Sequence, residues 1–293
     1  MTLRAERQGV MRNTYSDSYI GVGMRAGLGG LVVEGFDGAS VKQGFASGFD
    51  ICYMGDFGRH YGFLIGLNFN FLSSGVDIDA VSSEFSDEVE LGMGNGGFIV
   101  GTAHFTGSTQ SVKETYTSSF LEIPIMFTYT SDANTFINLG LKFAVPLSLK
   151  ATYRCKTSDL IMDYVETTGT DILPLNYRVS QYDDESGSYT FYGSGGKMRS
   201  LTVMAALEMG FRIQFLRNSS LQFSIYGDYA LGSLSINNAA SDMLLTMENE
   251  RVNYRGVLNA GDVVGLRYFK YGIRMQYNIG IGSPRSGKPI SIL

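Results

Sequence analysis

The chain has 293 residues, of which 17% are charged and 44% hydrophobic, and its mean hydropathy is +0.02. The net charge of −5, from 23 basic and 28 acidic residues, gives no electrostatic basis for binding nucleic acid. No apolar run approaches the roughly 20 residues of a membrane-spanning helix, and abundant Gly, Tyr and Phe with only 5 prolines is typical of β-sheet.

Eight segments alternate between bulky apolar residues and small, polar or charged ones, with a period of two. In the last segment, Phe269, Ile273 and Met275 alternate with Lys270 and Arg274. Because successive side chains of a β-strand point to opposite faces, this period predicts strands. The predicted strands are residues 19–33, 44–54, 60–72, 118–130, 135–153, 198–215, 220–236 and 262–281.

The connections between these segments alternate between short and long. The short ones are turn-rich, at 55–59, 131–134 and 216–219, and the long ones are 34–43, 73–117, 154–197 and 237–261. Short turns at one rim and long loops at the other are typical of an outer-membrane barrel. Within the loops, we expect residues 97–106 and 111–117 to extend the second hairpin and residues 238–250 to form a short helix.

The two faces of the predicted strands differ in size and charge. The bulky face carries Phe45, Phe49, Phe63, Phe69, Phe71, Phe127, Phe143, Phe211, Phe215, Phe223 and Phe269. These side chains would overfill an eight-stranded barrel, whereas the small residues of the other face, such as Gly23, Gly48 and Gly210, fit inside. We therefore expect the bulky face to meet lipid, with Arg267 at the loop-side rim, where an arginine costs only about 0–1 kcal/mol.

These patterns predict an all-β fold, a closed antiparallel eight-stranded transmembrane β-barrel with short periplasmic turns and long extracellular loops. We assign residues 1–18 to an N-terminal periplasmic segment, 19–281 to the barrel and 282–293 to a C-terminal periplasmic tail. Charged residues 4, 6 and 7 interrupt the start of the chain, so we expect a mature form whose export signal has been removed.

Two further expectations concern cysteines and tyrosines. Cys52 and Cys155 fall at opposite ends of the predicted barrel, which predicts two free thiols rather than a disulfide. Tyrosines near strand ends are expected in interfacial aromatic belts. They are Tyr53, Tyr61, Tyr129, Tyr153, Tyr229 and Tyr268.

The fourth predicted strand reads Phe120-Leu-Glu-Ile-Pro-Ile-Met-Phe-Thr-Tyr129. It resembles the Leu-Glu-Ile-Pro strand of PorT-like outer-membrane barrels, which are common in Bacteroidetes. The plan of eight strands and four long loops is similar to that of the OmpA-type transmembrane barrel. The resemblance implies a location in the bacterial outer membrane and brings no catalytic residues. The tail from Ser283 to Leu293 lacks the terminal aromatic residue of many such barrels.

Ten charged residues are predicted to face the lumen. They are Arg25, Asp50, Glu122, Lys142, Lys150, Glu208, Arg212, Asp228, Lys270 and Arg274. Buried ions must be paired, because an unpaired one costs several kcal/mol. We therefore expect a network of ion pairs that plugs the lumen. Because six of the ten are basic, the alternative is a narrow or gated conduit with a mild preference for anions.

Enzymatic and metal chemistry have less support in the sequence. His60 follows a short turn, and His104 lies in a long loop near Thr102 and Ser108 without a carboxylate at a defined spacing. We predict no catalytic residues, no cofactor and no metal site. The acidic stretches 77–79 and 183–185 and the glycine-rich stretch 92–97 are interpreted as solvated or flexible loop.

The leading hypothesis is a non-enzymatic outer-membrane protein with a structural or surface-interaction role. Its expected partners are outer-membrane lipid and, through the extracellular loops or the periplasmic tail, other envelope proteins. One alternative is a pore for small solutes or ions. Another is a subunit of an export or uptake machine, as the PorT resemblance would allow, and the last is a membrane-embedded lipid-modifying enzyme.

Overall fold

The computed structural model describes most of the chain and is built of β-strands. The described residues are 14–16, 18–34, 39–57, 60–92, 98–155, 157–167, 172–183, 186–190, 201–216, 218–235, 245–248, 251–254, 256, 265–281 and 284–286. Within these ranges there is no helix with the length and apolar character needed to cross a membrane.

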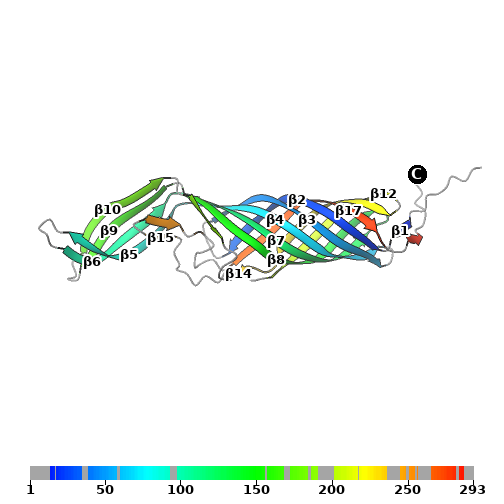
Figure 1. The fold of residues 1–293 in the computed structure, drawn as a ribbon, viewed down its shortest axis with the longest axis horizontal. Helices are drawn as coiled ribbons and strands as arrows, with labels where there is room; N and C mark the ends of the chain where they lie inside the picture. The colour runs from blue at the N-terminus through cyan, green and yellow to red at the C-terminus, as the bar shows by residue number, and fades with distance from the viewer. Residues whose placement is uncertain are drawn as a thin grey trace, which may run out of the picture.

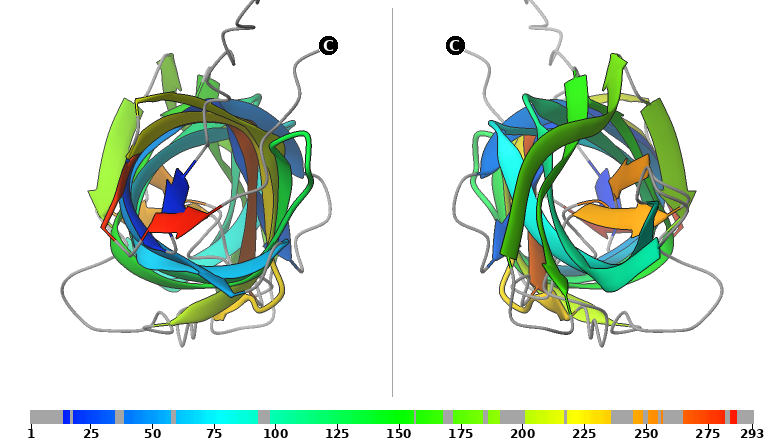
Figure 2. Two further views of the ribbon diagram at one scale, coloured as in Figure 1. Left: turned by 90° about the vertical axis from the view of Figure 1, so that its right-hand side faces the viewer. Right: turned by 90° about the vertical axis from the view of Figure 1, so that its left-hand side faces the viewer.

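Eight long strands form a ring in which every strand pairs antiparallel with its neighbours in the chain (Figures 1 and 2). They are β2 (Ser18–Glu34), β3 (Ala39–Phe57), β4 (Tyr61–Ile78), β7 (Val112–Thr130), β8 (Thr135–Cys155), β12 (Thr202–Leu216), β13 (Ser219–Ala230) and β17 (Gly265–Gly280). The ring is completed because β17 pairs with β2 along its whole length. The predicted eight-stranded antiparallel barrel is confirmed.

The strands are longer than predicted on the side of the long loops. β4 continues to Ile78 and β7 begins at Val112, and these two residues are paired. Residues 112–117 therefore extend the second hairpin, as expected. Residues 98–109 do not, because they form β6 (Phe98–Thr109), which pairs with β5 (Val81–Gly92) and β9 (Thr157–Thr167).

A second, four-stranded sheet lies beyond the loop-side end of the ring, at the left of Figure 1. Its strand order is β10-β9-β6-β5, where β10 is Ile172–Asp183. We call these four strands the distal sheet. The long connections at 73–117 and 154–197 thus supply the strands of an ordered sheet.

The fourth long loop also contains strand where a helix was expected. β15 (Leu245–Glu248) and β16 (Arg251–Tyr254) form a hairpin, and β15 lies against β5 and β6 of the distal sheet. The helix predicted for 238–250 is therefore wrong at 245–248, and its other residues lie outside the described part of the chain. Pairing between β15 and β16 explains the difference, because it takes up backbone groups that a helix would need internally.

Short strands complete the two ends of the barrel. β11 (Ser186–Thr190) pairs with β8, and β14 (Leu234–Ser235) pairs with β17. Near the opposite, turn-side end, β1 (Thr14–Ser16) pairs with β18 (Pro284–Ser286). Figure 1 places β1 just beyond that end, and the left view in Figure 2 shows the pair within the outline of the ring.

The bulky face of the ring points outward, as predicted. Phe45, Phe49, Phe127 and Phe211 are exposed on the outer surface, together with many isoleucines and leucines. Glycines make room inside: a Cβ atom at Gly23 would lie 2.9 Å from a carboxylate oxygen of Asp50. The barrel is thus inverted relative to a soluble protein, with apolar groups outside and polar groups inside.

Apolar side chains also fill part of the interior. A buried cluster runs from the loop-side half of the ring, through Leu72 and Phe120, to Phe105 and Leu160 of the distal sheet. A smaller cluster near the turn side includes Tyr19, Met54, Leu64 and Met126. The continuous first cluster joins the distal sheet to the barrel through one hydrophobic core.

Candidate functional site

Nine of the ten predicted lumen charges are buried inside the ring. Each side chain projects from a position whose neighbours along the strand face outward, so the pleat brings all nine into one interior. They are Arg25, Asp50, Glu122, Lys142, Glu208, Arg212, Asp228, Lys270 and Arg274. The structure therefore brings together residues drawn from seven of the eight strands.

Lys150 is the exception, because it is exposed on the outer surface. A β-bulge in β8, opposite Ser119 and Phe120 of β7, inserts one residue between Pro146 and Ser148. An inserted residue reverses the alternation of faces beyond it. Leu149 is consequently buried and Lys150 points outward, so its prediction as a lumen residue is wrong.

Arg274 is the centre of one half of the network. Its Nη1 donates to both carboxylate oxygens of Glu208, at 2.9 and 3.1 Å, and its Nε and Nη2 donate to Asp50. Ser224 Oγ adds a hydrogen bond to Glu208 at 2.6 Å. The planar guanidinium presents several donors in fixed directions, so it binds both carboxylates at once and holds each in a defined orientation.

Asp228 is the centre of the other half. Lys142 Nζ lies 2.6 Å from each of its carboxylate oxygens, and Lys270 Nζ lies 3.6 Å from Oδ2 and also donates to Glu122. Arg25 joins the two halves, because its Nε donates to Asp50 at 3.1 Å and its Nη1 lies 3.9 Å from Asp228. The eight charged residues of these two halves thus form one connected network.

Arg212 stands apart from this network. Its guanidinium lies over the ring of Tyr19, 5.0 Å from the centroid. The Gln222 amide is assigned with its oxygen toward Arg212, where it accepts from Nε and Nη2 at 3.0 and 2.9 Å. The described lumen therefore holds five basic groups and four acidic ones from the predicted set, and the loss of Lys150 weakens the case for anion preference.

Several buried polar atoms in the lumen have no hydrogen-bond partner among the described residues. They include both Nη atoms of Arg25, Oε2 of Glu122 and both amide atoms of Asn68. Buried polar groups of this kind are normally satisfied by ordered water. The ionic layer therefore has the chemistry of a hydrated interior, although its charges are mutually neutralised.

Aromatic side chains are packed inside the loop-side half of the ring. The rings of Phe120 and Tyr268 stack with centroids 4.5 Å apart, and Tyr116 beside them is fully buried. The expectation that Tyr268 belongs to an outer aromatic belt is wrong, since it is 1% exposed. The sequence contained the signal for this inward position. Tyr268 lies an even number of residues from the inward-facing Lys270 and Arg274, and Phe120 lies two residues from the inward-facing Glu122, so the strand alternation places both rings inside.

The other tyrosines expected in a belt mostly lie outside. Tyr53, Tyr61, Tyr129 and Tyr229 are exposed on the outer surface, whereas Tyr153 is partly buried against the apolar cluster. Arg267 on the outer face is paired with Glu34, with 2.6 Å between Nε and Oε1. That pair lies near the loop-side end of β17, where an arginine is tolerated.

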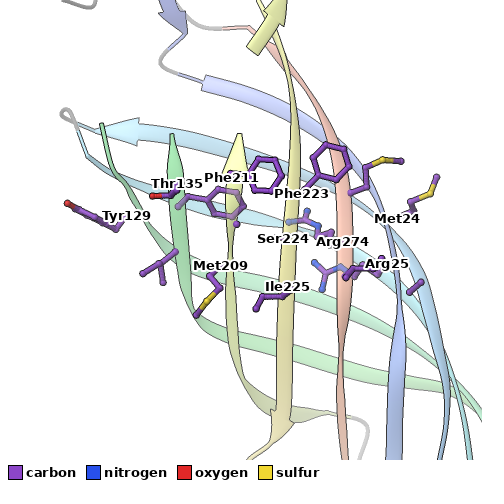
Figure 3. Close-up of a pocket in the computed structure, with 16 residues that line it drawn as sticks. Met24, Arg25, Tyr129, Thr135, Met209, Phe211, Phe223, Ser224, Ile225 and Arg274 are labelled. Carbon is purple, nitrogen blue, oxygen red and sulfur yellow. The ribbon is translucent and has the colours of Figure 1, made fainter. Parts of the chain in front are cut away.

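A groove of about 890 Å³ crosses the outer surface of the barrel (Figure 3). Outward side chains form its walls, among them Met24, Met209, Phe211, Phe223 and Ile225. Arg25, Ser224 and Arg274 also line the groove, but most of its lining side chains belong to the apolar outer face that we expect to meet lipid.

The histidines lie outside the ionic network. His60 Nδ1 is 2.8 Å from the Thr130 carbonyl at the turn side, and His104 stacks on Tyr164 in the distal sheet, 3.8 Å from Glu166. Cys52 and Cys155 are buried thiols that are not joined in a disulfide. Cys52 borders the network, because its Sγ accepts a hydrogen bond from Arg274 Nη2 at 3.7 Å. The described residues contain no group of three or more His, Cys, Asp and Glu side chains placed to hold a metal ion.

A ring of eight antiparallel strands, with an apolar outer face and an ion-paired interior, defines a transmembrane β-barrel of the bacterial outer membrane. The family model described as outer membrane protein beta-barrel domain matches residues 16–236. This match spans more than half of the chain, and the protein belongs to that family. The sequence has no match among curated proteins.

Solved structures of other outer-membrane proteins are similar at low identity. Ail, the attachment invasion locus protein of Yersinia pestis, is 8% identical with a TM-score of 0.27, over 90% of this chain and 99% of that one. The translocator domain of the autotransporter NalP from Neisseria meningitidis is 9% identical with a TM-score of 0.23, over 93% and 91%. The CymD monoaromatic hydrocarbon channel is 9% identical with a TM-score of 0.17, over 92% and 90%.

Proposed function

We propose that this protein is a non-enzymatic outer-membrane barrel that does not conduct solutes and that presents the distal sheet as an extracellular contact surface. The observation that carries the proposal is the filled interior. An ionic layer centred on Asp228 and Arg274 and an aromatic layer around Phe120 and Tyr268 occupy successive parts of the lumen. Eight strands leave little room beyond such side chains.

The distal sheet supports a role in contact with other molecules. Its outer side chains are rich in carboxylates, including the exposed Glu84, Glu88 and Glu166. Among the described residues, the outer strands β5 and β10 each pair on one side only. Because it shares the hydrophobic core of the barrel, the sheet is a firmly held platform rather than a flexible loop.

Single-channel recording in planar bilayers tests the closed lumen. We expect purified protein to insert without steady conductance, whereas a general porin inserted in the same bilayer conducts. Replacing residues 81–109 and 157–183 with short glycine-serine links tests the contact role. That variant is expected to keep its folded, faster-migrating gel band but to lose adhesion of expressing cells to surfaces that the parent cells bind. Steady conductance of the parent, or unchanged adhesion of the variant, contradicts the proposal.

A pore for water or very small solutes is the second candidate. The buried polar atoms of Arg25, Asn68 and Glu122 without protein partners favour it, since they provide sites for water along part of the lumen. In this case swelling of proteoliposomes in small polyols would exceed that of protein-free liposomes. The closed lumen predicts equal rates.

A place in an envelope machine is the finer assignment that the PorT-like strand suggests. Its motif follows the alternation of a barrel strand. Leu121 and Ile123 are at outward-facing positions, and Glu122 points inward, where it accepts a hydrogen bond from Lys270. Detergent extraction and affinity purification from the native host test this assignment. Specific co-purification of envelope proteins, lost when the distal sheet is removed, is expected if the assignment holds.

A further inference from the structure

Four basic side chains gather on the outer surface near the loop-side end of β3, β7 and β8. We call Lys42, Lys113, Lys150 and Arg154 the basic patch, and all four are exposed. None belongs to the lumen network. The patch exists because the bulge in β8 turns Lys150 outward instead of inward.

The patch begins where the apolar outer surface ends. Along the β7–β8 hairpin, outward side chains change from Ile125, Phe127 and Leu141 to threonines and basic residues. The change falls at Ser119 and Ser148, whose hydroxyl oxygens are 2.7 Å apart. Because the outward apolar band of a barrel matches the hydrocarbon layer, Lys150 lies at the level of the lipid headgroups.

The register of the strands sets the size of the patch. Lys150 is opposite Thr117, and Arg154 is opposite Lys113. Four residues along a strand span about 13 Å, and the three strand spacings from β3 to β8 span about 14 Å. Threonines 115, 117 and 152 lie between the basic side chains and add hydroxyl groups at the same surface.

The charge of the patch is one-sided. Asp77 lies opposite Lys113 in the register, and its carboxylate is 3.6 Å from Lys42 Nζ, so Lys42 and Asp77 form a partly exposed ion pair at one edge of the patch. Lys113 and Lys150 are further exposed cations of the same surface. The rim at β2 and β17 differs, because Arg267 is neutralised there by Glu34. A local excess of positive charge next to a lipid-facing surface favours an anionic headgroup.

We propose that the basic patch binds the phosphorylated headgroup of an anionic lipid in the leaflet on the loop side. The acyl chains then lie against the apolar face below Ser148, and the phosphate oxygens accept hydrogen bonds from Lys150 and its neighbours. This site is independent of the closed lumen and of the distal sheet, so its test does not depend on the proposed function.

The test measures the thermal transition of the folded barrel, read as the change in gel mobility on heating, in defined lipid. Vesicles of phosphatidylcholine are compared with vesicles containing phosphatidic acid in phosphatidylcholine. We expect phosphatidic acid to raise the transition temperature of the parent protein. The variant K113Q/K150Q/R154Q is expected to lose that increase. Arg178→Gln, an exposed arginine of the distal sheet, serves as the matched control and is expected to keep it.

Native mass spectrometry of the single variant Lys150→Gln provides a second measurement in case the triple variant does not fold. The ratio of bound phosphatidic acid to bound phosphatidylcholine is expected to fall about fivefold for one lysine. Adding inorganic phosphate to phosphatidylcholine vesicles separates the two sources of phosphate and is expected to have no effect. The proposal is overturned if Lys150→Gln leaves the ratio of bound phosphatidic acid to bound phosphatidylcholine unchanged. It is also overturned if the triple variant keeps the full increase in transition temperature, or if inorganic phosphate alone produces that increase.

Discussion

Lys142 Nζ lies 2.6 Å from both carboxylate oxygens of Asp228, a residue 86 positions away in the chain, and both side chains are almost completely buried. Asp228 also lies near Lys270 and Arg25. Asp228 therefore lies among three cations, and together with Asp50 and Glu122 it offsets their mutual repulsion in a low-dielectric interior.

Asp228→Asn is expected to lower the free energy of unfolding by about 3–5 kcal/mol, because it leaves the buried ammonium group of Lys142 without its carboxylate partner. Urea titration of the folded gel band in detergent measures this change. The double variant D228N/K142M is expected to recover part of the lost stability, since it removes the buried positive charge that has no carboxylate partner in Asp228→Asn. Lys150→Gln removes an exposed charge and is the control, with little effect expected. Similar losses for the control and for Asp228→Asn would contradict the buried network.

Gly272→Val is expected to destabilise the barrel by about 1–3 kcal/mol through overpacking. A Cβ atom at Gly272 would lie 2.2 Å from the carbonyl oxygen of Ala26 on the neighbouring strand, so the strands would have to separate. Gly227→Val is the matched control, because a Cβ atom there meets nothing within 4 Å on the outer face. The same urea titration should leave the control close to the parent. Equal effects at the two glycines would disprove the close approach of β2 and β17.

Phe120→Ala is expected to cost about 3–5 kcal/mol, because it leaves a cavity beside Tyr268 in the closed half of the lumen. Phe127→Ala, on the same strand but exposed on the outer face, is expected to cost less, since lipid or detergent can fill the space. The difference between the two unfolding free energies is the measurement. An equal or larger loss at Phe127 would argue against the aromatic closure.

Cysteine labelling should separate the two sides of β8. In a background with Cys52 and Cys155 replaced by alanine, Lys150→Cys is expected to react quickly with a membrane-impermeant maleimide added to intact cells. Lys142→Cys is expected to stay unlabelled until the barrel is unfolded, because Lys142 is 1% exposed. Mass spectrometry of the intact protein counts the adducts. Protection of position 150 together with labelling of position 142 would mean that the faces of β8 are reversed.

The alternation of residue types predicted much of the site as well as the fold. Glu122, Lys270 and Arg274 were placed in the lumen from parity alone, and the structure puts them there. The prediction from alternation fails beyond a β-bulge, because an inserted residue reverses which side chains face inward. The alternation of residue types continues unbroken through the bulge near Ser148, so alternation alone does not predict the outward turn of Lys150. Pro146, directly beside the bulge, is the signal that the sequence offers, because proline inside a sheet is found mainly at edges and bulges.

The distal sheet was missed for a different reason. Its strands, such as β6 and β9, come from two loops separated by the β7–β8 hairpin, and their pairing is a long-range event. Short alternating stretches in a long loop predict strands only when a partner is known. The helix expected at 238–250 failed in the same way, because the pairing of Leu245 with Tyr254 decides the local structure.

The barrel follows from the order of residues alone, since a period of two with bulky residues on one face and charges on the other is compatible with a closed sheet in lipid and with little else. Which charges meet, the bridge that Arg274 makes between Asp50 and Glu208, and the surface position of Lys150 follow from the folded barrel. Ion pairing and strand register depend on distances across the barrel, and those distances are set by closure of the ring rather than by any local pattern.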